Sequence, residues 1–218
     1  MMIFRNYWFR IGGILLALIT LDLIFRQPQL TKVQCLLIFN FMALLAHQLE
    51  EYQLPGGAPL VINRVIYDEH ELTDRYPGNM QSIMIVNTSA WIIYVLAIAF
   101  PGVYWLGLGV ILFSLFQVLG HVFQMNLKLH TWYNPGMATT ICLFIPIGVN
   151  YIRFVMKNNL VTGWNWATAV IVLMACILLT IVLPVQALKN KQTSYRIPNW
   201  QIKRFHEVCR FAHVGRLK

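Results

Sequence analysis

Forty-five consecutive residues, from Tyr76 to Gly120, contain no Asp, Glu, Lys, Arg or His. A second uncharged run extends from Asn158 to Leu188. A helix needs about 20 mostly apolar residues to cross the hydrocarbon core of a bilayer. Both runs are too long for the interior of a small globular domain. Only 11% of the 218 residues are charged, against about 25% in soluble domains. The sequence therefore predicts an integral membrane protein.

The apolar segments predict six transmembrane helices. Forty-five uncharged residues are too many for one helix, so Pro101-Gly102 is interpreted as a break between two spans. The first apolar run has no small-x-small cleavage site, which indicates a retained span rather than a signal peptide. The predicted fold class is all-α, a polytopic transmembrane helix bundle of about six spans. The spans are expected at residues 5–25, 33–52, 81–99, 103–126, 136–153 and 165–188.

The predicted domain organisation is a transmembrane helical domain over residues 1–188 and a basic cytoplasmic tail over residues 189–218. Eight of the 17 Lys and Arg residues lie in this tail, which explains much of the net charge of +9 without a nucleic-acid partner. A short amphipathic helix is expected here, lying on an anionic membrane surface. Its apolar stripe consists of Ile202, Phe205, Cys209 and Ala212.

The positive charges also predict the orientation, because loops rich in Lys and Arg stay in the cytoplasm. With both termini in the cytoplasm, 13 cationic residues lie on the inner side of the membrane and four on the outer side. The four outer residues are Arg26, Lys32, Arg153 and Lys157.

Three ionisable residues end the predicted second span, in the segment 47-HQLEE-51. His47, Glu50 and Glu51 share one helical face because their spacing is i, i+3, i+4, and Asn40 lies on that face two turns earlier. Ionisable groups inside a span are costly and usually mark a functional site. This face is therefore the candidate site.

Polar residues of the following segments are predicted at the same membrane depth. The third span carries Asn87 near its start, and the fourth carries Gln117 and His121 near its end. His130 and Tyr133 follow in the next turn. We expect these groups to converge, with a supporting polar shell made of Asn40, Asn87, Gln117, His130 and Tyr133.

The spacing of the cluster resembles that of a metal site. In the inverted zincin motif H-x-x-E-H, residues i and i+4 bind zinc and the glutamate at i+3 is the base. Here Glu51 replaces the second histidine. We predict a divalent metal ion, zinc rather than iron, bound by His47, Glu51 and His121, with one position left for water. Glu50 is the predicted general base that takes the proton of that water.

Other interpretations of the same residues stay open. The cluster could be a hydrogen-bonded helix end that joins helices without a metal. His47 and His121 could be axial ligands of a haem. A di-iron carboxylate site is disfavoured, because such bundles use Glu-x-x-His pairs and the spans contain none.

Two segments, 46-AHQLEEY-52 and 121-HVFQMNLKLHTWYNPGMATTICLFIPIG-148, resemble the HXXEE-domain membrane proteins, a bacterial family named for that motif. The resemblance covers roughly residues 40–150. It implies a bacterial cytoplasmic membrane and a site containing His47, Glu50, Glu51 and His121, and it implies no particular activity. Where the family pattern often has an asparagine, four residues before the second histidine, this chain has Gln117. The matching positions of the second segment are His121, Tyr133, Pro135, Gly136, Thr139 or Thr140, and Pro146.

These observations predict a metal-dependent membrane enzyme. Hydrolysis of a lipid or other hydrophobic small molecule at the cytoplasmic leaflet is the preferred reaction, because the chain has little soluble domain to recognise a large polar substrate. A membrane-embedded iron oxidoreductase is the alternative enzyme. An ion or small-solute transporter is the alternative outside enzymes, and it requires polar residues that continue toward the outer face. Asp22 could extend such a path, although pairing with Arg26 is simpler. The sequence leaves the oligomeric state open.

Overall fold

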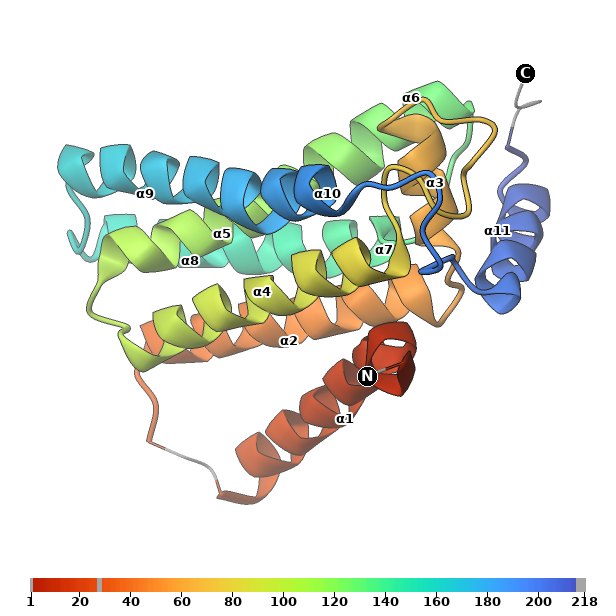
Figure 1. The fold of residues 1–218 in the computed structure, drawn as a ribbon. Coiled ribbons are helices and arrows are strands. Elements are labelled where there is room, and N and C mark those ends of the chain that lie inside the picture. The colour runs from red at the N-terminus through yellow and green to blue at the C-terminus, as the bar shows by residue number, and fades with distance from the viewer. Residues whose placement is uncertain (1, 27–28, 215–218) are drawn as a thin grey trace.

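Residues 2–26 and 29–214 are described by a computed structural model (Figure 1). Every regular element in this part of the chain is a helix, and six helical segments are long and apolar enough to cross a membrane. The predicted all-α fold class and the number of spans are confirmed. The six segments are Ile3–Phe25, Lys32–Tyr52, Met80–Ala99, Tyr104–Leu129, Met137–Lys157 and Gly163–Leu188.

Three of the spans contain a π-helical stretch. Such stretches widen the helix, change which side chains share a face, and are frequent at functional sites.

The first span is α1 (Met2–Arg26), the second α2 (Lys32–Tyr52) and the third α4 (Met80–Ala99). The fourth joins α5 (Tyr104–Val118), η1 (Leu119–Met125) and α6 (Asn126–Leu129); the fifth joins α7 (Met137–Thr139), η2 (Thr140–Phe144) and α8 (Ile145–Lys157); the sixth joins α9 (Gly163–Cys176), η3 (Ile177–Val182) and α10 (Leu183–Leu188).

Local sequence explains where the second and third spans begin. Thr31 and Gln34 form a reciprocal capping box at the start of α2, which satisfies backbone groups that the helix leaves free. Asn79 and Ser82 do the same for α4. The starts of α2 and α4 are therefore specified by residues just before or within their first turn.

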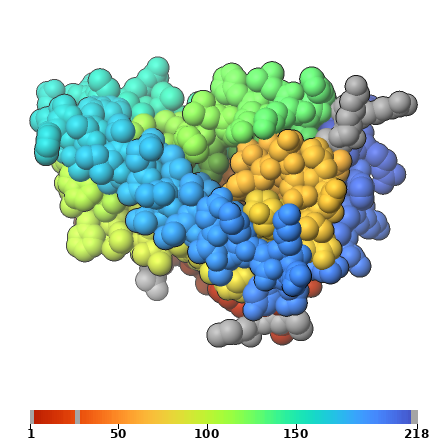
Figure 2. Space-filling view, turned by 45° about the horizontal axis from the view of Figure 1, so that its top comes forward, coloured from red at the N-terminus to blue at the C-terminus, as the bar shows by residue number. Residues whose placement is uncertain are grey.

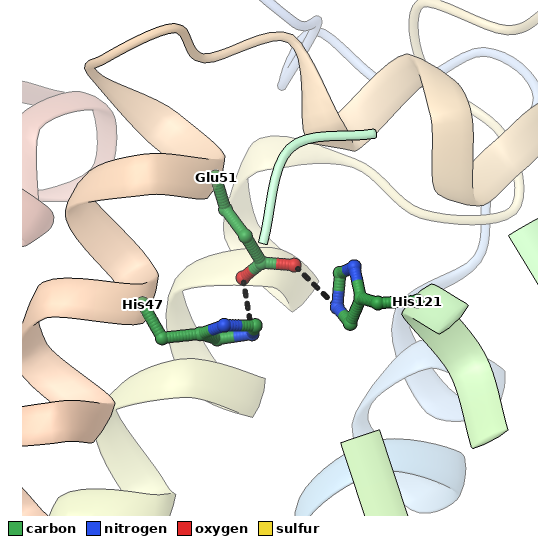
Figure 3. A group of neighbouring side chains, drawn as sticks. All are labelled: His47, Glu51 and His121. Atoms are coloured by element: carbon green, nitrogen blue, oxygen red, sulfur yellow. Dashed lines mark ion pairs between the residues drawn. The ribbon is translucent and has the colours of Figure 1, made fainter. Parts of the chain in front are cut away.

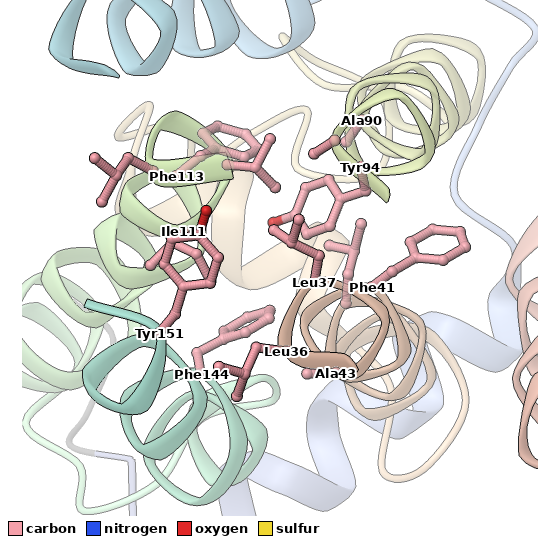
Figure 4. Packing of buried hydrophobic residues seen from close by; sticks show 14 of the residues in the cluster. Leu36, Leu37, Phe41, Ala43, Ala90, Tyr94, Ile111, Phe113, Phe144 and Tyr151 are labelled. Carbon is pink, nitrogen blue, oxygen red and sulfur yellow. The ribbon is translucent and has the colours of Figure 1, made fainter. Parts of the chain in front are cut away.

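Helix α2 lies at the centre of the bundle and packs against α1, α4, α5 and α8. The core around it is built from large apolar side chains, including Leu37, Phe41, Tyr94, Phe144 and Tyr151 (Figure 4). Helix α1 approaches the bundle at one end and diverges from it at the other (Figure 1). The candidate site is therefore carried by the most enclosed span rather than by a peripheral one.

One end of the bundle is covered by two short helices, α3 (Ala58–Val65) and α11 (Asn199–Phe211). The α3 segment fills the space beside the ends of α6 and α10 (Figure 2). The Gln201 side chain joins α11 to the end of α2, because it donates to the Tyr52 carbonyl at 2.6 Å and accepts from the Gly57 amide at 2.7 Å. Phe205 and Ala212 of the predicted apolar stripe are buried. Ile202 and Cys209 pack against the same buried cluster as Phe205, so the stripe faces the bundle, whereas the sequence predicted that it lies on a membrane surface.

Candidate metal centre

His47, Glu51 and His121 meet inside the end of the bundle that α3 and α11 cover. His47 and Glu51 lie on the last turns of α2, and His121 lies in η1 of the fourth span. All three side chains are buried, and one possible ligand atom from each lies within 4.8 Å of the others. The Glu51 carboxylate is placed between the two imidazole rings (Figure 3). The structure therefore brings together the three residues that the sequence predicts as ligands.

A hydrogen-bond network holds the His121 ring in one orientation. Its Nδ1 atom lies 2.7 Å from Asn134 Oδ1. The Asn134 amide nitrogen donates to the His121 carbonyl and to Asn126 Oδ1, each at 2.7 Å, so the Asn134 oxygen faces the ring. Nδ1 must then be the protonated nitrogen, which leaves a lone pair on Nε2. That lone pair is directed toward Glu51.

The His47 ring is held in the same way by a hydroxyl group. Its Nδ1 atom lies 2.9 Å from Thr139 Oγ1. The single Thr139 hydroxyl hydrogen is directed to Glu50 Oε2 or to the Gly136 carbonyl, both of which can only accept. His47 Nδ1–H is consequently the donor to Thr139. His47 Nε2 keeps its lone pair, and it is buried without a hydrogen-bond partner in the described structure.

The distances between the three candidate ligands fit a bound cation better than direct hydrogen bonds. His47 Nε2 lies 3.7 Å from Glu51 Oε2, and His121 Nε2 lies 3.5 Å from Glu51 Oε1. An N–H···O hydrogen bond spans about 2.7–3.2 Å. Two ligands on tetrahedral zinc, with bonds of about 2.0–2.1 Å, lie about 3.4 Å apart. The donor types suit a transition-metal ion, and each histidine lies near the ligand–ligand separation of zinc from a different oxygen of Glu51.

The geometry disfavours a haem between the two histidines. Their ring centroids are 4.9 Å apart, the rings are perpendicular, and the Glu51 carboxylate lies between them. A porphyrin bound by both rings would have to occupy that same space.

Gly136 allows the start of the fifth span to lie directly against both rings. Its φ is +102°, a conformation that side chains of L-residues rarely adopt. A Cβ atom at this position would overlap His121 Cε1 and would lie 2.8 Å from His47 Cε1. Only glycine fits here without moving the two histidines.

A family model described as "Protein of unknown function with HXXEE motif" matches residues 38–151, more than half of the chain. The chain belongs to the HXXEE family. The matched segment contains His47, Glu50, Glu51 and His121 together with Asn134 and Thr139, so the network described above lies within it. No curated protein and no solved structure matches the chain.

The predicted polar shell of this HXXEE protein is only partly gathered around the cluster. Tyr133 donates to Glu50 Oε1 at 2.9 Å. Burial, followed by the charge of Glu50, raises the pKa of the Tyr133 hydroxyl, so this group stays a donor. Asn87 instead contacts Gln48 and Tyr52 on another face of α2.

The other three shell residues lie apart from the cluster. Asn40 is fully buried, two turns from His47, and its amide has no hydrogen-bond partner among the described residues. Gln117 is half-buried and contributes no hydrogen bond to the cluster within the described chain. His130 is exposed at the end of α6, with a φ of +49°. The hydrogen bonds to the His47 and His121 rings therefore come from other residues.

Those residues are Asn134 and Thr139, which sequence reasoning did not assign to the site. Asn134 stands in a turn before Pro135 and Gly136, where an asparagine is most simply read as a turn former. Thr139 occupies a position of the family pattern, but the sequence does not show which groups it contacts. Their roles depend on contacts made across 13 residues for Asn134 and 92 residues for Thr139.

Proposed function

We propose that this HXXEE protein is a metal-dependent integral membrane enzyme whose ion, zinc rather than iron, is bound by His47, Glu51 and His121. One observation supports the metal above all. Three buried groups face one another, and with both imidazoles neutral the tautomers inferred above leave no hydrogen on either Nε2 atom. One proton can bridge only one of the two histidine–glutamate pairs, and both pairs are longer than hydrogen bonds. A cation relieves the mutual repulsion of all three groups at once.

The reaction that we propose is hydrolysis of a lipid or another hydrophobic small molecule. A bound zinc ion supplies Lewis-acid chemistry and lowers the pKa of a bound water toward about 7. The chain's own contribution is to hold His47 and His121 with their Nε2 atoms toward the ion and to exclude bulk water by burial. The site lies in the final turns of a span, near the level where a membrane ends, which suits an amphiphilic substrate.

The end of α2, which carries His47 and Glu51, lies on the same side of the bundle as the start of α1 and the tail helix α11 (Figure 1). The predicted excess of Lys and Arg on this side favours the cytoplasm. We therefore propose that the site lies at the cytoplasmic leaflet of a bacterial cytoplasmic membrane, on the basis of the charge distribution and the family resemblance.

The enzyme proposal is tested by reconstituting the purified protein in nanodiscs with a bacterial lipid extract and zinc. Mass spectrometry should detect lipid cleavage products that are absent with Glu51→Gln or with a chelator. A wild-type protein that binds zinc but cleaves no lipid would overturn the hydrolase while leaving the metal site in place. Elemental analysis of the same preparation separates zinc from iron, since two histidines and a carboxylate also suit Fe(II).

A transport function is a second candidate because of two buried polar groups farther along the bundle. The Asn40 amide and the Tyr151 hydroxyl are both fully buried in the apolar core, and neither has a hydrogen-bond partner among the described residues. Buried polar groups normally have partners, so such groups are candidates for a path across the membrane. Proton or cation flux into proteoliposomes, abolished by Asn40→Leu, would favour transport. Absence of flux in the wild-type protein would exclude it.

A further inference from the structure

Glu50 and Glu51 are adjacent in sequence but have different surroundings. Glu50 Oε1 accepts from the Tyr133 hydroxyl at 2.9 Å and from the Ala138 amide at 3.0 Å. Glu50 Oε2 accepts from the Thr139 amide at 2.8 Å and from the Thr139 hydroxyl. A carboxylate has about four acceptor positions, so the chain's own donors occupy all of them.

Two of these donors are backbone amides at the start of the fifth span. The first amides of a helix have no partner within the helix, and they favour a negative charge nearby. Glu50 on α2 supplies that charge from another helix, so it joins the second span to the fifth. The same contact places the Thr139 side chain between the Glu50 carboxylate and the His47 ring.

The Thr139 hydroxyl transmits the effect of the carboxylate to the ring. Of its two possible acceptors, Glu50 Oε2 is closer than the Gly136 carbonyl, so we assign its hydrogen to Glu50, and its oxygen accepts the Nδ1 hydrogen of His47. In many metalloproteins a carboxylate accepts the second N–H of a ligand histidine, fixing its tautomer and increasing its basicity. Here a threonine hydroxyl lies between the two groups.

We infer that Glu50 is a positioning residue that acts on His47 through Thr139, and is not the general base that the zincin-like spacing predicts. The inference rests on the proposed metal site, because its effect is to present His47 Nε2 to the ion. A general base needs a free lone pair toward its substrate or water, and the four bonds of Glu50 leave none.

The test compares Thr139→Val with Thr139→Ser in the full-length protein in detergent. Both variants keep the backbone amide that bonds to Glu50, but only serine keeps the hydroxyl. Zinc affinity, measured by competition with a chromophoric chelator, should fall about 10–100-fold in Thr139→Val and stay at the wild-type value in Thr139→Ser. Glu50→Gln should also weaken zinc binding, whereas loss of a mere base would leave it unchanged.

A second readout is independent of metal. In metal-free protein labelled with 15N-histidine, the His47 signal, assigned with a His47→Gln variant, should show the Nδ1–H tautomer in the wild type and Thr139→Ser. In Thr139→Val it should show a mixture of tautomers. An unchanged tautomer together with unchanged zinc affinity in Thr139→Val would overturn the inference. A wild-type protein that binds no metal would overturn the proposed function, while a tautomer change in Thr139→Val would still support the positioning role.

Discussion

Two polar clusters lie side by side on the end of α2, and they differ in whether their polar atoms have hydrogen-bond partners within the protein. The Gln48 oxygen accepts from Trp91 Nε1 at 2.8 Å, and the Gln48 nitrogen is 3.2 Å from Asn87 Oδ1. The Asn87 nitrogen in turn donates to the Tyr52 hydroxyl at 3.1 Å. Donors and acceptors therefore alternate along the series of hydrogen bonds from Trp91 through Gln48 and Asn87 to Tyr52. The second cluster begins one residue earlier, at His47. In this cluster the Nε2 atoms of His47 and His121 face the Glu51 carboxylate, and all three groups are acceptors in the tautomers inferred above.

The difference separates two roles that composition alone does not distinguish. Both clusters are polar and lie in the last turns of a transmembrane helix. Each side-chain nitrogen and oxygen of the Gln48 cluster has a hydrogen-bond partner within the protein, so the cluster can join α2 to α4 as structural hydrogen bonding does. In the His47 cluster, His47 Nε2 has no hydrogen-bond partner among the described residues, and in our proposal a cation completes it. Each variant within a cluster is expected to affect that cluster and leave the other intact, and variants outside both clusters serve as controls.

The largest effect is expected from removing a candidate ligand. Glu51→Gln and His121→Ala each remove one of three protein ligands, so zinc affinity should fall by more than the roughly 10–100-fold that outer partners contribute. The measurement is zinc titration of purified protein against a chromophoric chelator. Gln48→Leu is the control and should bind zinc as the wild type does. Equal affinities in all of these proteins would contradict the ligand assignment.

Gly136→Ala should have the next largest effect, because the new Cβ must displace the rings of both His47 and His121. We expect loss of zinc binding and a lower melting temperature, since a side chain at this positive φ is also strained. Gly120→Ala is the matched control, because a Cβ there has no heavy atom within 4 Å. Thermal unfolding and zinc titration of the two variants should therefore diverge, and similar behaviour would contradict the close approach at Gly136.

Asn134→Leu should have an intermediate effect on metal binding. The substitution leaves His121 Nε2 in place but removes the oxygen that accepts the Nδ1 hydrogen. Zinc affinity should fall about 10–100-fold. Asn158→Leu, at an exposed helix end, provides a control with the same change of side chain. An affinity equal to the wild type in Asn134→Leu would show that the ring orientation does not depend on this amide.

Gln48→Leu should affect stability rather than metal binding. It removes the acceptor of Trp91 Nε1 and the donor to Asn87, and groups left without partners cost about 1–3 kcal/mol each. Reversible unfolding in detergent should show a loss of this size. A protein as stable as the wild type would mean that the closed cluster contributes little to the joining of α2 and α4.

The smallest effect is expected at the surface beside the clusters. Arg10 donates to Gln53 in an exposed contact, so Arg10→Ala should change the free energy of unfolding by no more than about 0.5 kcal/mol. The same unfolding assay gives this value. A change in the free energy of unfolding as large as that of Gln48→Leu would show that burial does not explain the difference between the Gln48 contacts and the exposed Arg10–Gln53 contact.

Much of the fold follows from the sequence because its signals are local. Long uncharged runs specify the spans, and the spacing of His47 and Glu51 places them on one face of a helix. Even the convergence of His121 on them follows from the depth of each polar residue in its span. These inferences require only helix geometry and the thickness of a bilayer.

The remaining features depend on contacts that helix geometry alone does not give. Gln117 lies one turn before His121 and is predicted in the polar shell, but η1 is π-helical and Gln117 is only half-buried. His130 follows the same span and ends it instead of turning toward the site. The partners of the two histidines come from the segment around Gly136, whose position is set by packing against α2. The stripe of α11 has the same pattern whether it covers protein or membrane.

The central claim is that the His47 cluster needs a cation and the Gln48 cluster does not. The most direct measurement is the zinc content, by elemental analysis, of wild-type protein purified without chelator, beside Gln48→Leu and the double variant His47→Ala, His121→Ala. We expect close to one equivalent in the wild type and in Gln48→Leu, and none in the double variant. A wild-type protein without a transition metal, even after dialysis against zinc, or equal metal content in all three proteins, would contradict the claim.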